Sequence, residues 1–214
     1  MKKGYTHVSI LLDRSGSMSS IQESILSGFN EFIQKQKNEP GQLTVTLVTF
    51  ADAGDYKVLY NFVNVQEIQG LTDKSYRADG MTALNDSFVK LIKDTGEVLS
   101  ALSEENRPEK VLLVSLTDGI ENDSKEYPGP EGNKKLKEII QHQKDKYSWE
   151  FLYIGANQDS FSEGVQTRGY SKAVNFSADT IGTQAMYKGM GETLTIFRST
   201  GNLEVKENEN ENQQ

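Results

Sequence analysis

Short apolar runs alternate along the chain with longer segments of mixed character. The short runs are rich in β-branched or aromatic residues and are bounded by polar or turn residues, which is typical of strands buried on both faces of a sheet. The clear candidates cover residues 8–12, 43–50, 111–116 and 151–154, and the weaker ones cover residues 57–65 and 173–176. The pattern therefore predicts six strands.

The longer segments predict amphipathic helices, because their apolar residues recur at helical spacing and form one stripe in each segment. The stripes cover residues 21–33, 84–102, 136–140 and 181–197. Strands that alternate with helices indicate a mostly parallel sheet with helices on both faces. The predicted fold class is therefore α/β, with a doubly wound, Rossmann-like sheet.

One connection is too short for a parallel arrangement. Only the segment ADAGDY separates residues 43–50 from residues 57–65. A parallel crossover needs a dozen or more residues, whereas an antiparallel hairpin needs only a few. We therefore expect one antiparallel edge strand.

The composition fits a single domain with a polar end. The chain has 214 residues, of which 36% are hydrophobic, which is enough for one sizeable core. From Ser199 the sequence reads STGNLEVKENENENQQ, with little apolar content after Val205. Such a segment buries too little surface to offset its ordering entropy. We expect a domain over residues 1–198 and an acidic, Asn/Glu-rich, disordered tail over residues 199–214.

Charge and cysteine content exclude several function classes. The formal net charge is −8 and the isoelectric point is near 4.9, so the chain lacks the positive field that nucleic acid or an anionic membrane requires. The absence of cysteine excludes disulfides, thiolate zinc sites and cysteine nucleophiles. No apolar stretch approaches the roughly 18 residues that span a bilayer, and the N-terminal segment lacks a signal-peptide pattern. We therefore expect a soluble, cytoplasmic protein.

Two aspartates stand at the ends of predicted strands. Asp13 ends the first strand, and Asp118 follows the run at residues 111–116. In doubly wound sheets, sites form outside the carboxyl ends of the strands, where the strand order reverses. If these two strands are neighbours, both carboxylates face one crevice.

Small hydroxyl residues accompany the two aspartates. Ser15 and Ser17 occupy alternate positions after Asp13, and Thr82 follows a glycine just before a predicted helix. Alone, the serines are better explained as helix caps and Asp118 as part of an Asp-Gly turn. Together, carboxylate and hydroxyl oxygens suit a hard dication such as Mg²⁺.

This set of residues resembles the metal-ion-dependent adhesion site of von Willebrand factor type A domains. The resemblance rests on Asp13, Ser15 and Ser17 in a DxSxS motif, on the separate Thr82, and on Asp118 in TDG, and it extends over about residues 4–198. It implies a sheet of order 3-2-1-4-5-6 with one antiparallel edge. It also implies that these five residues ligate Mg²⁺ or Mn²⁺, and that an aspartate or glutamate of a protein partner completes the coordination.

The threonine loop departs from the family pattern, in which two glycines usually precede the threonine. Here Asp79 and Gly80 stand before Met81, and the extra negative charge of Asp79 either strengthens metal binding or repels an acidic ligand. Met81 is equally well explained as an exposed partner contact and as a core residue. Further residues that fall just after predicted strands are candidates for support of the site or for ligand contact: Asp52, Asn157 and Asp159.

Of three function classes, the first, which is not enzymatic, is the one that we expect, and the other two are alternatives. The first is a non-enzymatic binding module that uses a metal to hold a partner's carboxylate. The second is a Mg²⁺-dependent phosphohydrolase, which needs a second carboxylate two residues after the nucleophilic aspartate, where this chain has Ser15. The third is an adaptor subunit of a larger assembly, such as one with a MoxR-type ATPase or a phage or stress-response component. Nothing in the residues indicates an oligomeric state.

Overall fold

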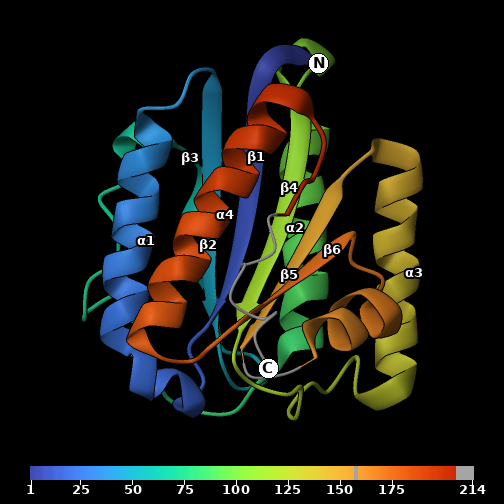
Figure 1. Cartoon of the computed structure of the whole chain (residues 1–214). Helices are drawn as coiled ribbons and strands as arrows, with labels where there is room; N and C mark the ends of the chain where they lie inside the picture. Colours follow the sequence, from blue (N-terminus) through green and yellow to red (C-terminus); the bar gives the residue numbers. More distant parts are fainter. Residues whose placement is uncertain (157–158, 206–214) are drawn as a thin grey trace.

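A six-stranded sheet lies between two layers of helices (Figure 1). The structure is a computed structural model, and it describes residues 1–156 and 159–205. The strands are β1 (Lys2–Asp13), β2 (Gln42–Phe50), β3 (Tyr56–Asn64), β4 (Pro108–Thr117), β5 (Glu150–Ala156) and β6 (Lys172–Phe176). The longer helices are α1 (Gln22–Lys37), α2 (Leu84–Ala101), α3 (Gly129–Tyr147) and α4 (Thr180–Thr200). Shorter helical turns are η1 (Gly16–Ile21), η2 (Val65–Glu67), η3 (Glu104–Asn106) and the π-helical η4 (Phe161–Arg168).

The strand order is β3-β2-β1-β4-β5-β6. Only the β2–β3 pair is antiparallel, and the four other pairs are parallel. The expected fold class, strand order and antiparallel edge are therefore confirmed. The order reverses between β1 and β4, so the carboxyl ends of these two strands lie side by side at the lower edge of the sheet in Figure 1.

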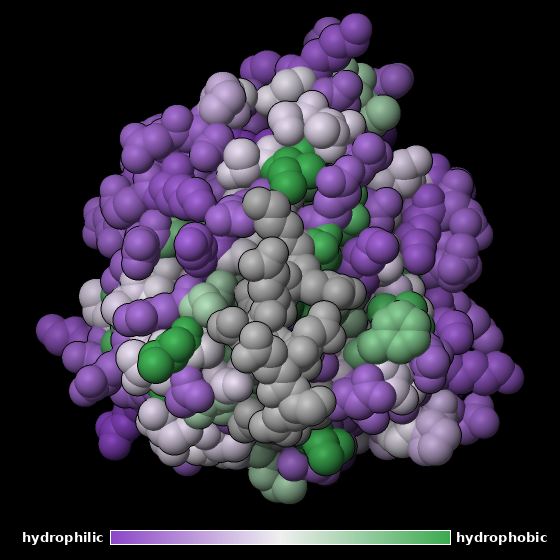
Figure 2. All heavy atoms as spheres, in the orientation of Figure 1, coloured by the Kyte–Doolittle hydropathy of each residue, from purple (hydrophilic) through white to green (hydrophobic). Residues whose placement is uncertain are grey.

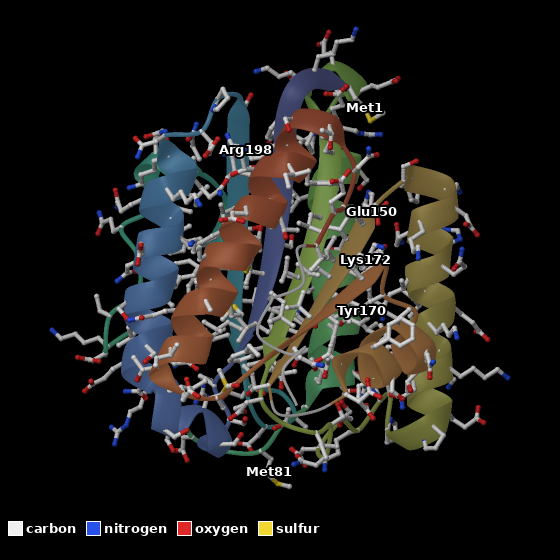
Figure 3. All side chains as sticks on the ribbon, viewed as in Figure 1. Met1, Met81, Glu150, Tyr170, Lys172 and Arg198 are labelled. Atoms are coloured by element: carbon white, nitrogen blue, oxygen red, sulfur yellow. The ribbon has the colours of Figure 1, made fainter. Side chains whose placement is uncertain are left out.

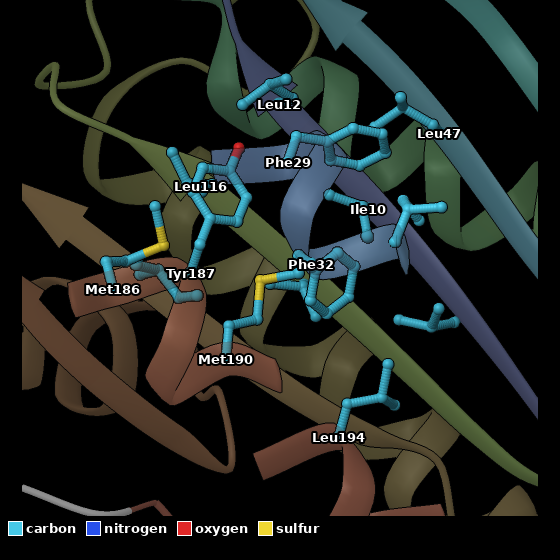
Figure 4. Close-up of a cluster of buried hydrophobic side chains, with 14 of the residues drawn as sticks. Ile10, Leu12, Phe29, Phe32, Leu47, Leu116, Met186, Tyr187, Met190 and Leu194 are labelled. Atoms are coloured by element: carbon cyan, nitrogen blue, oxygen red, sulfur yellow. The ribbon is translucent and has the colours of Figure 1, made fainter. Parts of the chain in front are cut away.

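Each face of the sheet buries its own apolar cluster. One cluster lies under α1 and α4, and the other lies under α2 and α3. In the first, Phe29 and Phe32 of α1 meet Tyr187 and Met190 of α4 above Ile10 (Figure 4). These helices belong to sequence segments far apart, so the shared cluster fixes their position over β1.

A glycine permits the close contact between α1 and α4. A Cβ atom at Gly28 would lie 2.4 Å from Cδ2 of Tyr187, so the tyrosine ring occupies the space that a side chain at this position would need. The Tyr187 hydroxyl is buried, and burial raises its pKa above the ordinary value. Because the ring fills the space at Gly28, it sets how closely the two helices approach.

The first strand is longer than its apolar run predicts. Residues 2–7 extend β1 at its N-terminal end, and the polar His7 within this part is fully buried. The His7 ring hydrogen-bonds the hydroxyls of Thr44 and Ser9, at 2.9 Å each, and Ser9 also bonds Thr95 of α2 at 2.9 Å. Polar residues of β1 are thus buried because β2 and α2 supply partners.

The described part of the C-terminal segment stays close to the domain. Helix α4 continues through Thr200, two residues past the expected domain end at residue 198, and Leu203 is buried in the cluster under α1 and α4. Residues 206–214 of the expected tail lie outside the described residues. The division into a domain and a disordered tail stays a prediction. Among the described residues, no helix is both long and apolar enough to cross a membrane.

Candidate metal centre

Asp13 is the buried residue around which the candidate site is built. Asp13 has no exposed surface, because β2 and β4 flank β1 along the length of that strand. The carboxylate accepts two hydrogen bonds, one from the backbone N–H of Ser15 at 2.7 Å and one from the Thr117 hydroxyl at 2.5 Å. Both oxygens of Asp13 are therefore held in place by the protein.

A chain of hydroxyls links the first strand to Asp118. The Ser15 and Ser17 hydroxyl oxygens lie 3.2 Å apart, and the Ser17 hydroxyl donates to Oδ1 of Asp118 at 2.6 Å. Ser15 is buried and Ser17 is exposed, so the chain runs from the interior to the surface. Because the Ser15 N–H also bonds Asp13, hydrogen bonds connect four of the five expected ligands: Asp13, Ser15, Ser17 and Asp118.

Thr82 reaches the same place from the loop before α2. A Cβ atom at Gly119 would lie 2.8 Å from Oγ1 of Thr82 and 3.6 Å from Oδ2 of Asp13. The Thr82 hydroxyl and the Asp13 carboxylate thus both lie close to Gly119, and the Thr82 side chain packs where a side chain of residue 119 would need to be. The fifth expected ligand therefore also lies near Asp13.

Main-chain hydrogen bonds hold the loops of the site together. The Gly16 N–H donates to the Gly80 carbonyl at 2.9 Å, and the Asp79 N–H donates to the Arg14 carbonyl at 2.7 Å. The buried Tyr76 hydroxyl donates to the backbone carbonyl of Asp13 at 2.7 Å. The DxSxS loop (residues 13–17) and the threonine loop (residues 79–82) are therefore joined by hydrogen bonds.

The threonine loop is also hydrogen-bonded to the loop that follows β4. The Thr82 N–H donates to the side-chain oxygen of Asn122 at 2.9 Å, and the Thr82 carbonyl accepts from the N–H groups of Asn122 and Asp123 at 3.0 and 3.2 Å. The Glu121 carboxylate accepts from the Asn85 N–H at the start of α2 at 2.8 Å. All three loops that carry candidate ligands are therefore fixed relative to one another.

The two carboxylates lie where negative charge is poorly compensated. Burial raises the pKa of Asp13 to about 6, despite its hydrogen bonds, and burial also raises the pKa of Asp118. Arg14, the basic residue next to Asp13, pairs instead with Asp55. A cation placed between the aspartates would offset the cost of burying their charges.

The residues expected to support the site have different surroundings. Asp52 accepts a hydrogen bond from the Met81 N–H at 2.8 Å, and Asp79 accepts one from the Gly80 N–H at 2.9 Å. Gly80 has a φ of +87°, and a Cβ there would lie 2.5 Å from Oδ2 of Asp52, so glycine is required by both conformation and space. Met81 is 47% exposed, which excludes the alternative that it fills the core.

The two remaining candidates from the sequence are Asp159 and Asn157. Asp159 accepts a hydrogen bond from the Ser162 N–H at 3.0 Å and thereby stabilises the start of η4. Asn157 lies outside the described residues.

Two residues of the site were missed by the sequence reasoning. Thr117 binds Asp13 directly, and Tyr76 holds its backbone carbonyl. The signal for Thr117 was its place at the end of β4, since Leu12 pairs with Leu116 and the next residue along each strand is Asp13 and Thr117. Tyr76 carries no comparable signal, because it lies in an irregular loop 63 residues away along the chain.

The donor set fits a hard divalent cation better than a soft one. Within the described residues no three histidine, aspartate or glutamate side chains gather as a metal-binding group. The expected donor set consists instead of two carboxylates and three hydroxyls. Oxygen donors of this kind suit Mg²⁺ or Mn²⁺. The raised pKa values of the Asp13 and Asp118 carboxyls, which come from burial, agree with such an ion.

No protein-family model and no curated protein matches the chain. Solved structures do match it. A von Willebrand factor type A protein from Catenulispora acidiphila is 14% identical with a TM-score of 0.60, over 91% of this chain and 43% of that one. The pilus adhesin SpaC from Lactobacillus rhamnosus GG, in an open conformation, is 14% identical with a TM-score of 0.61, over 91% of this chain and 30% of that one.

A third match is proximal thread matrix protein 1 from the mussel byssus, whose structure has a zinc-occupied MIDAS motif. It is 11% identical with a TM-score of 0.54, over 90% of this chain and 46% of that one. The chain thus spans less than half of the length of each of these proteins. At such low identity the likeness shows the fold alone, which is that of von Willebrand factor type A domains.

Proposed function

We propose that this chain is a non-enzymatic protein-binding module that uses a divalent metal, Mg²⁺ or Mn²⁺, to hold an acidic side chain of a partner. The proposed ligands are Asp13, Ser15, Ser17, Thr82 and Asp118, in part through water. The observation that carries the proposal is that oxygen donors from three separate loops lie close together at the strand-order reversal.

The charge of the donor set supports this role. Two aspartates neutralise a dication without exceeding its charge, and the hydroxyls add no further negative charge. A metal held in this way stays electrophilic and keeps affinity for one more anionic oxygen from outside. Asp118 is partly exposed and Ser17 is exposed, so that oxygen has a route from solvent.

The folds and names of the structural neighbours are consistent with a binding role. Those neighbours include a pilus adhesin and a thread matrix protein, and a zinc-occupied site has been seen in one of them. Binding of metal and partner by this chain remains our proposal, as does its cytoplasmic location.

Isothermal titration with Mg²⁺ tests the metal site. We expect a single site in the wild-type protein and none in the Asp13→Ala variant, with Asp159→Ala as a control that removes an aspartate from another loop. Unchanged Mg²⁺ affinity in Asp13→Ala would refute the assignment of Asp13 to a metal site. Mg²⁺-dependent turnover of p-nitrophenyl phosphate by the wild-type protein, lost in Asp13→Ala, would instead favour the phosphohydrolase.

A further inference from the structure

Large apolar side chains are exposed at few positions of the described chain. They are Met1, Val58, Met81, Ile120, Tyr147, Phe161 and Ile181. On the face shown in Figure 2, hydrophilic residues predominate and apolar residues form small, separate patches. Single exposed apolar residues are ordinary in soluble proteins. The exception is the pair Met81 and Ile120, because each is adjacent in sequence to a residue of the candidate metal centre.

Met81 and Ile120 are the sequence neighbours of two residues that lie close together, Thr82 and Gly119. Met81 directly precedes Thr82 and is 47% exposed, and Ile120 directly follows Gly119 and is 71% exposed. The Met81 side chain points away from the body of the molecule at the edge where the parallel strands end (Figure 3). A partner that approaches the metal therefore meets both side chains.

The exposure of this pair is not the result of loose loops. The Met81 N–H is bonded to Asp52 at 2.8 Å, and the backbone of Thr82 makes three hydrogen bonds with residues 122–123. The backbone of Met81 and Thr82 is thus fixed, which limits the positions that the Met81 side chain can reach before any partner binds.

The charges beside Met81 are negative. Asp52 and Asp79 are both exposed, and each accepts a hydrogen bond from the backbone of residues 80–81. Carboxylates beside the candidate metal centre repel any second acidic group of a partner. The same surface therefore attracts one carboxylate, through the metal, and disfavours an acidic tract.

We propose that Met81 and Ile120 form an apolar rim of the metal centre, and that this rim selects a partner segment with one carboxylate flanked by large aliphatic side chains. The proposal rests on the proposed function, because the metal positions the carboxylate. Partial burial of two leucine side chains against the rim strengthens binding by about tenfold over a segment with small polar flanks.

Three capped tripeptides serve as probes of the rim. They are acetyl-Leu-Glu-Leu-amide, acetyl-Ser-Glu-Ser-amide and acetyl-Glu-Glu-Glu-amide, titrated in Mg²⁺ into protein with labelled methionine and isoleucine methyl groups and followed by NMR. The expected order is Leu-Glu-Leu about tenfold tighter than Ser-Glu-Ser, with Glu-Glu-Glu no tighter than Ser-Glu-Ser. The Met81 and Ile120 methyl signals should shift most with the leucine peptide.

A double variant separates the rim from the metal. Met81→Ser combined with Ile120→Ser should bind Mg²⁺ in the calorimeter, which also shows that it folds, but should bind the two glutamate peptides with leucine or serine flanks equally. The control is Ile181→Ser, which removes a side chain that is 80% exposed at the start of α4. It should keep the wild-type preference.

The outcomes distinguish the two proposals. Equal affinity of the wild-type protein for the leucine and serine peptides overturns the rim and leaves the proposed function standing. A preference that persists in the double variant also overturns the rim. If no peptide binds in Mg²⁺, or binding is unaffected by a chelator, the proposed function itself fails and the rim fails with it.

Discussion

The buried His7 should make the stability of this protein depend on pH. Its ring is stacked on Phe62, with 3.6 Å between ring centroids, and it hydrogen-bonds Thr44 and Ser9. Burial lowers the pKa of His7 to about 3, from an ordinary value of 6.5. The folded chain therefore keeps the ring neutral at a pH where the unfolded chain takes up a proton. This contribution to stability is complete above pH 6.5 and is lost as the pH falls below it.

The size of the effect follows from proton linkage. Between pH 7.5 and pH 5.5, where the unfolded ring becomes mostly charged and the folded ring does not, the free energy of unfolding should fall by about 1.4 kcal/mol because of His7. Asp13 acts in the opposite direction, since its raised pKa makes the folded chain the first to take up a proton. The effect of His7 is therefore obtained by difference between variants that share Asp13.

Urea unfolding at pH 7.5, 6.5 and 5.5 in the presence of a chelator measures this difference. His7→Gln removes the titrating group and keeps a polar side chain, and His142→Gln makes the same change at the other of the two histidines, which is exposed. The wild-type protein and His142→Gln should show the same loss towards pH 5.5, whereas His7→Gln should show a loss smaller by about 1.4 kcal/mol. Equal losses in all three proteins would refute the reasoning.

Two glycine substitutions test the geometry of the site and of the helix packing. Gly119→Ala should weaken Mg²⁺ binding by about tenfold or more in calorimetry, because its Cβ would lie 2.8 Å from the Thr82 hydroxyl oxygen; wild-type affinity would show that the metal does not use this space. Gly28→Ala should lower the free energy of urea unfolding by about 1–3 kcal/mol through its clash with Tyr187. The control for both is Gly189→Ala in α4, where a Cβ would meet no atom within 4 Å and the helix should gain about 0.5–1 kcal/mol. A Gly28→Ala protein as stable as the control would contradict the packing seen here.

The periodic parts of the fold could be predicted from the sequence because their signals are local. Apolar runs located the strands, and the short connection at residues 51–56 indicated the antiparallel edge. The N-terminal half of β1 could not be found in this way, because Thr6 and His7 interrupt its apolar character. Their burial depends on partners from β2 and α2, which a local pattern does not contain.

The π-helical η4 was missed for a related reason. Its sequence, FSEGVQTR, has no apolar stripe, and its Arg168 is buried because Asn85 of α2 and Glu163 accept hydrogen bonds from the guanidinium. Such a cluster of distant polar partners leaves no periodic signal in the sequence. The element therefore becomes visible only in three dimensions.

Some residues of the candidate site could likewise be predicted from the sequence, and others could not. Asp13, Ser15, Ser17, Thr82 and Asp118 could be chosen from residue type, spacing and position at strand ends, and the structure brings them together. Thr117 could have been found from the pairing of β1 with β4. Tyr76 could not, because only the path of an irregular loop brings its hydroxyl beneath Asp13.

The hydrogen bonds between the Gly16 and Gly80 backbones, and between those of Asp79 and Arg14, have a consequence for protein engineering. They use peptide groups, which every residue other than proline supplies, so apart from the glycine that position 80 requires they do not involve the side chains of the loops. The side chains of Met81 and Ile120 can therefore be exchanged while the donor atoms of the candidate site stay where they are, provided that Asp52 and Asn122, which bond the loop backbone, are kept. This face is a natural scaffold for libraries in which new binding specificities are selected at Met81, Ile120 and their exposed neighbours.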